Sequence, residues 1–72
     1  MTMSISEKIR LIARRKKVTL TALAEKTGQT NQNLSGKLSR NNFTVRQIME
    51  IGEVLGCEVE INFIDKASGE KL

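Results

Sequence analysis

Residues 19–40, which read TLTALAEKTGQTNQNLSGKLSR, decide the fold of this chain. Two short helical stretches meet here at a turn, and Gly28 stands where that turn needs a positive φ. Ala24 is small at the point where the second helix must cross the first closely. The apolar residues expected inside the pair are Leu23, Leu34 and Leu38. This pattern predicts a corner of two helices, the second of which projects outward with a polar surface.

Two further helices are expected to flank this corner. Ser4 and Glu7 form an S-x-x-E capping box, and Thr44 and Gln47 form a T-x-x-Q box. Thr19 and Thr30 are expected to cap the two central helices, and Gly56 to end the last one. The predicted helices cover residues 4–17, 20–27, 30–39 and 45–55, and the outer two carry the apolar stripes Ile5, Ile9, Ile12 and Ile48, Ile51, Leu55.

After Gly56 the apolar pattern changes to a period of two. Over residues 57–64 every second residue is apolar, and this alternation predicts a β-strand. The apolar residues are Cys57, Val59, Ile61 and Phe63, and they alternate with Glu58, Glu60, Asn62 and Ile64. A single strand needs a neighbour for its backbone groups. That neighbour is either the N-terminal stretch of the same chain or, more economically, the same strand of a second subunit. Residues 65–72 are expected to form a flexible tail.

Composition excludes several classes of function. With one cysteine and no histidine, the 72 residues cannot form an internal disulfide or a usual zinc site, and no cofactor is expected. There is no histidine for general-base work, no glycine-rich phosphate loop after a strand and no paired carboxylates, so we expect no enzyme. No secretory signal or membrane-length apolar run is visible, which favours a single cytoplasmic domain. We interpret Phe43 and Phe63 as core residues and Cys57 as a small packed hydrophobe.

The charge is unevenly distributed along the chain. Residues 1–46 contain ten Lys or Arg and two Glu, a net charge of +8, whereas residues 47–72 carry a net charge of −4. A basic half attracts a polyanion such as nucleic acid, although a solvated surface of mixed charge is the alternative. The cluster at 14–17 is either a phosphate-binding patch or the ordinary basic end of a helix.

The motif L-A-x-x-x-G followed by a polar helix resembles the helix-turn-helix of the phage-repressor and Cro-type regulators, the XRE family. The resemblance covers Ile5–Gly56. It implies a mainly α, compact four-helix repressor-like fold, with helix 30–39 in the major groove of double-stranded DNA. One position departs from the family: Leu20 stands where a glutamine is common at the start of the second helix, so Thr19 or Thr21 would replace that contact.

The resemblance also implies which residues contact DNA. Asn and Gln side chains suit base reading, since each can bond adenine at two atoms. Base-reading positions are Thr30, Asn31, Gln32 and Gly36; backbone or flanking positions are Thr19, Thr21, Asn33, Ser35, Lys37, Arg40, Asn41 and Asn42. Gly36 either lets the helix approach the groove or lets two helices pack closely.

The sequence as a whole predicts one helix-turn-helix domain, with a helical core at 4–56, a dimerisation strand at 57–64 and a tail at 65–72. Its expected function is that of a homodimeric repressor bound to a near-palindromic operator, with no membrane or small-molecule partner. The alternative is a protein-interaction module on the same fold, an antitoxin or a co-regulator. The dimer contact would consist of Cys57, Val59, Ile61 and Phe63.

Overall fold

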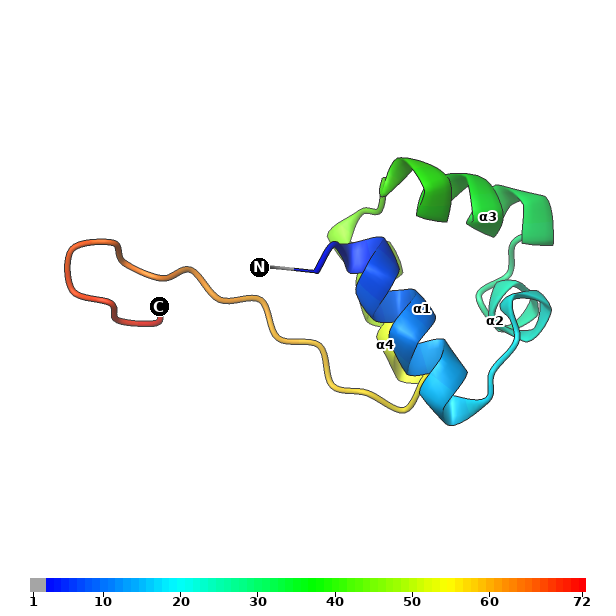
Figure 1. Ribbon diagram of the computed structural model, residues 1–72, viewed down its shortest axis with the longest axis horizontal. Coiled ribbons are helices and arrows are strands. Elements are labelled where there is room, and N and C mark those ends of the chain that lie inside the picture. Colours follow the sequence, from blue (N-terminus) through cyan, green and yellow to red (C-terminus); the bar gives the residue numbers. More distant parts are fainter. Residues whose placement is uncertain (1–2) are drawn as a thin grey trace.

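The computed structural model describes residues 3–72 and shows a mainly α fold of four helices (Figure 1). The helices are α1 (Ile5–Lys16), α2 (Leu20–Lys26), α3 (Asn31–Arg40) and α4 (Val45–Val54). These bounds agree with the predicted ranges to within one or two residues. No helix in the described part of the chain is long and apolar enough to cross a membrane.

All four helices begin at the predicted capping residue. The Ser4 hydroxyl accepts from Glu7 N–H at 3.1 Å, and Thr44 accepts from Gln47 N–H at 3.2 Å. In return, the side chains of Glu7 and Gln47 accept from the backbone N–H groups of Ser4 and Thr44, which completes the two capping boxes. The remaining two caps are Thr19, which accepts from Ala22 N–H, and Thr30, which accepts from Asn33 N–H. These predictions are confirmed.

All four helices also end in the same way, with one residue of positive φ. These residues are Lys17 (58°), Gly28 (70°), Asn41 (52°) and Gly56 (68°). In each case the next N–H donates to the carbonyl five residues before it, at 2.8–3.0 Å, which is the Schellman arrangement. The two predicted glycine stops are thus confirmed. Lys17 has a Cβ in this conformation, which costs roughly 1 kcal/mol.

The core lies where the four helices meet. Its fully buried residues are Ile9, Ala13, Leu23, Ala24, Leu34, Leu38, Ile51 and Leu55. Leu23 and Leu34, at the centre of the predicted corner, are 0% exposed. Phe43 packs against this core as expected, and so does Cys57. Ile5 was expected in the apolar stripe, but it lies at the helix start and is 37% exposed.

A buried polar contact fixes α1 against the end of α3. Ser6 is 6% exposed, and its hydroxyl lies 2.7 Å from the Leu38 carbonyl oxygen. The backbone N–H of Ser6 donates to Asn41 Oδ1 at 3.0 Å. The Ser6 N–H lies in the first turn of α1 and has no acceptor within its own helix, so its bond to Asn41 joins two helix ends that are 35 residues apart in the chain.

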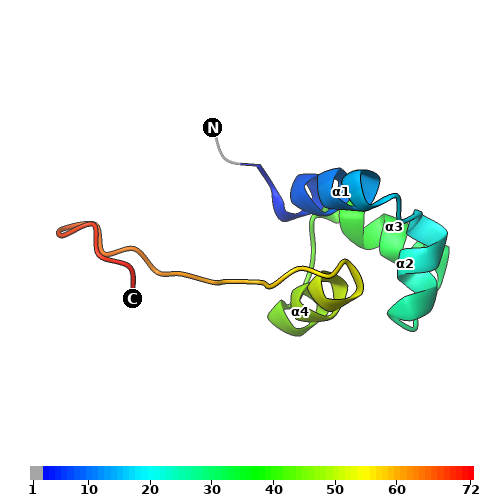
Figure 2. The ribbon, with the colours of Figure 1, turned by 90° about the horizontal axis from the view of Figure 1, so that it is seen from below.

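The expected strand over 57–64 is absent from the residues that the structure describes. The chain instead leaves α4 and runs away from the helices in an extended form (Figures 1 and 2). Only the isolated antiparallel bridge between Ile64 and Lys71 is recorded. The physical reason is that a strand is defined by its partner, and within residues 3–72 no second extended segment pairs with residues 58–62.

The first part of this segment is nevertheless anchored on α4. Cys57 N–H donates to the Gly52 carbonyl at 2.8 Å, and Gly52 is buried. A Cβ at this glycine would overlap Val59 Cγ2, so the absent side chain lets the segment lie directly on the helix. Beyond this point, the prediction that Phe63 lies in the core is wrong, because its side chain is 75% exposed.

Candidate nucleic-acid interface

The turn between α2 and α3 is held by side chains as well as by its glycine. The Thr27 hydroxyl donates to the Leu23 carbonyl at 2.8 Å and accepts from Gln29 Nε2 at 2.8 Å. Gln29 Oε1 in turn accepts from Lys37 Nζ at 3.2 Å. This series of bonds runs from the end of α2 through the turn to the second turn of α3. It fixes the angle at which α3 leaves the body of the molecule.

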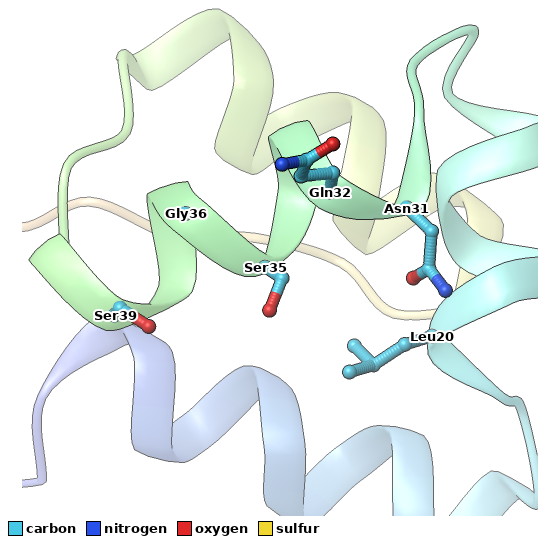
Figure 3. Close-up of a pocket in the computed structure, with 6 residues that line it drawn as sticks. All are labelled: Leu20, Asn31, Gln32, Ser35, Gly36 and Ser39. Carbon is cyan, nitrogen blue, oxygen red and sulfur yellow. The ribbon is translucent and has the colours of Figure 1, made fainter.

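Helix α3 has two chemically different faces. Leu34 and Leu38 are buried against the core, as predicted. The exposed residues are all polar: Asn31, Gln32, Asn33, Ser35, Ser39 and Arg40. A shallow hollow runs along this surface and is lined by Leu20, Asn31, Gln32, Ser35, Gly36 and Ser39 (Figure 3). The structure therefore presents amides and hydroxyls together on one open helix face.

The four predicted base-reading positions fall at the exposed start and middle of α3. Gln32 is exposed, and the structure records no side-chain hydrogen bond for it within residues 3–72. Asn31 donates through Nδ2 to Thr21 Oγ1 at 3.2 Å, which leaves its carbonyl oxygen and a second N–H open. Thr30 already accepts as the N-cap.

Gly36 lies in the hollow and touches no other helix. The three atoms nearest to a Cβ built on it all belong to the Arg40 guanidinium of the same helix, the closest being Nη2 at 3.3 Å. Of the two explanations for this glycine, close packing between helices therefore has no support. Its neighbourhood instead suits close approach of a ligand to α3.

Several of the predicted flanking residues have roles inside the protein. Lys37 is half-buried and bonds to Gln29, and Asn41 accepts from Ser6. Thr19 caps α2, and Thr21 bonds to Asn31. The remaining flanking residues, Asn33, Ser35, Arg40 and Asn42, are exposed. The structure thus separates residues that position α3 from those that are open to a ligand.

Two residues of the hollow were missed by the sequence analysis. Ser39 lies one helical turn beyond Ser35 and Gly36, and the helical period could have placed it on this face. Leu20 comes from the first turn of α2 and was noted only as a departure from the family. Its place in the hollow depends on how α2 and α3 cross, which no local pattern gives.

The basic residues near the interface are not neutralised by acidic neighbours. Across the described residues the structure shows one ion pair, Arg46 with Glu50 at 3.5 Å, and both belong to α4. The cluster at 14–17 is exposed and closes α1, where positive charge is also favourable for the helix end. Arg40 of α3 and the cluster at 14–17 are therefore open to an external polyanion.

Comparison with known proteins agrees with this geometry. The family model for the Cro/C1-type HTH DNA-binding domain matches residues 8–60, which include all of α2, α3 and α4. Searches of curated proteins and of solved structures gave no significant match. The match covers more than half of the chain. The four-helix fold, with α3 presenting a polar outward face, agrees with it. The chain therefore belongs to the Cro/C1-type helix-turn-helix family of DNA-binding transcription regulators.

Proposed function

We propose that this protein is a homodimeric repressor that recognises a specific double-stranded DNA sequence with the outward face of α3. In this proposal α3 lies in the major groove, and Asn31 and Gln32 bond to base edges. Gly36 keeps the middle of the helix close to the bases. Ser35, Ser39 and Arg40 lie beside them, and the exposed basic residues bind phosphates.

The polar outward face of α3 is the observation that carries the proposal. A helix that docks on a protein needs apolar anchors, and α3 has none outside the core. The large exposed hydrophobic residues of the described chain lie elsewhere: Met3, Ile5, Val45, Met49, Ile61, Phe63, Ile64 and Leu72. The protein-interaction alternative would therefore use a different surface from the one that α3 presents.

The segment that follows α4 supports the dimer. Within residues 3–72, none of the backbone N–H groups of residues 58–64 donates a hydrogen bond, and of their carbonyls only that of Phe63 accepts one, from Leu72 N–H. Ile61, Phe63 and Ile64 are 51%, 75% and 62% exposed. An open backbone edge with apolar side chains is what a second strand pairs with. Antiparallel pairing of two copies about a two-fold axis would satisfy both segments and form the predicted dimerisation strand over 57–64.

A dimer of this kind would place two α3 helices about 34 Å apart, one turn of DNA, and would read a near-palindromic site. Occupying such a site in a promoter blocks access to it, which is the simplest mode of regulation for this domain. The cytoplasmic location and the flexible tail over 65–72 remain predictions alongside this function.

The proposal is tested by selecting binding sites from a random duplex pool at two salt concentrations. We expect enrichment of one near-palindromic sequence, with an affinity that falls steeply as salt rises because bound phosphates release counterions. Enrichment of no sequence would contradict specific recognition.

The dimer is tested separately by sedimentation of the free protein and of the complex with the selected duplex. We expect two chains per duplex. A single chain on the duplex, together with a monomer at tens of micromolar protein, would contradict the dimer while leaving DNA recognition intact.

A further inference from the structure

One residue in the hollow of α3 differs in chemistry from the others. Leu20 is a branched apolar side chain among amides, hydroxyls and a glycine. It is half-buried: it packs against the core, and its side chain points from the first turn of α2 into the hollow beside Asn31 and Ser35 (Figure 3). Part of an apolar side chain thus faces the surface proposed to lie against DNA.

The major groove offers an apolar side chain a specific partner. The groove edges of guanine, adenine and cytosine present hydrogen-bond donors and acceptors, whereas thymine also presents its C5-methyl group. Leucine can neither donate nor accept a hydrogen bond. Contact with a methyl group is therefore the favourable way for Leu20 to meet a base edge, since it removes apolar surface from water on both sides.

We propose that Leu20 contacts the C5-methyl group of one thymine in each half-site and so determines the base preferred at that position. This inference rests on the proposed function. It also gives Leu20 a contact with DNA at the position where a glutamine is common in the family. The thymine would lie beside the bases read by Asn31, because the two side chains share one end of the hollow.

A purely structural role for Leu20 makes a different prediction. Val54 is also half-buried and packed on the core, but it does not line the hollow. Loss of packing at either position lowers stability. Only loss of a base contact changes the preference between thymine and an analogue without the methyl group.

The experiment replaces each thymine of the selected duplex in turn by deoxyuridine, which lacks only the C5-methyl group. Affinities are measured for the wild type, Leu20→Ala and the control Val54→Ala. At one position per half-site, deoxyuridine should weaken wild-type binding about fourfold, the effect of burying one methyl group. Val54→Ala should show the same loss, and Leu20→Ala should show none. If Leu20→Ala does not fold, Leu20→Gln keeps the side-chain length and should also be indifferent to the substitution.

Two results would overturn the inference. The first is a wild type that selects a site but tolerates deoxyuridine at every position, which leaves the proposed function standing. The second is a sensitive position at which Leu20→Ala and Leu20→Gln lose affinity as the wild type does. Selection of no site by the wild type would instead contradict the proposed function itself, and this inference with it.

Discussion

The helices at 5–54 and the segment at 57–72 differ in how much of their apolar surface is buried. The four helices satisfy their own backbone groups and share one core, in which Leu23 and Leu34 are completely buried. The segment after Gly56 is anchored only at its start, through Cys57 and Val59, and then exposes its apolar side chains. Both views show the extended course of residues 57–64 and the turn at 66–68 that brings Lys71 back beside Ile64 (Figures 1 and 2).

The difference shows which part of the chain pairs its backbone groups and buries its apolar side chains within a single copy. The helical part carries the polar outward face of α3, and the bonds through Thr27, Gln29 and Lys37 hold that helix at its angle to α2. The segment presents an open backbone edge and exposed hydrophobic residues, which a single copy leaves uncovered. Substitutions in the two regions should therefore affect different measurements, stability in the first and self-association in the second.

The largest effect is expected for Leu34→Ala. This side chain is 0% exposed at the centre of the corner, and removing it should lower the free energy of unfolding by about 2–5 kcal/mol. Denaturation in urea measures this change. The control is Ile61→Ala, half-exposed in the segment, which should change the stability of the dilute monomer by no more than about 0.5 kcal/mol. Both variants are therefore unfolded at a concentration where the chain is monomeric. Equal losses from both would contradict the contrast between the regions.

An intermediate effect is expected at Asn41, which holds α1 against the end of α3. Asn41→Ala removes the acceptor for Ser6 N–H and places a Cβ-bearing residue without a polar side chain at positive φ, so unfolding should become easier by about 1–3 kcal/mol. Asn41→Gly relieves the backbone and should lose less. Thermal unfolding of the two variants separates the hydrogen bond from the backbone conformation. Unchanged stability in Asn41→Ala would show that the contact with Ser6 contributes nothing.

The two phenylalanines give the most direct contrast. Phe43 packs on the core, and Phe43→Ala should cost roughly 2 kcal/mol of stability. Phe63 is 75% exposed, and Phe63→Ala should leave the stability of the dilute monomer within about 0.5 kcal/mol of the wild type. Unfolding is compared at a concentration where both are monomeric, and sedimentation at higher concentration should show weaker association for Phe63→Ala only. Unchanged association would remove Phe63 from the dimer contact.

Local features of the fold could be predicted from the sequence. All four capping residues and both glycine stops were identified, because a cap depends on side chains within three residues of it. The inward faces of the central helices followed from their periodicity. The polar surface of α3 followed from the same count, since Leu34 and Leu38 fix which side faces the core.

Features that depend on distant parts of the chain could not be predicted. The alternation over 57–64 favours a strand, but the pattern does not supply the partner that a strand needs. Asn41 and Lys37 were predicted as DNA-backbone contacts, and the sequence did not indicate that they also bond to Ser6 and Gln29 in the folded chain. The position of Leu20 beside α3 likewise required the crossing of two helices.

The most direct test of the account compares base preferences of Gln32→Ala and the wild type across all single-base variants of the selected site. Gln32 is exposed on α3, and a pair of hydrogen bonds to one base contributes about 1–3 kcal/mol of discrimination. Lys26→Ala, at the exposed end of α2, is the control. The account predicts that Gln32→Ala loses its preference at one position per half-site, whereas Lys26→Ala keeps every preference. A uniform loss across all variants, or none, would contradict base reading by α3.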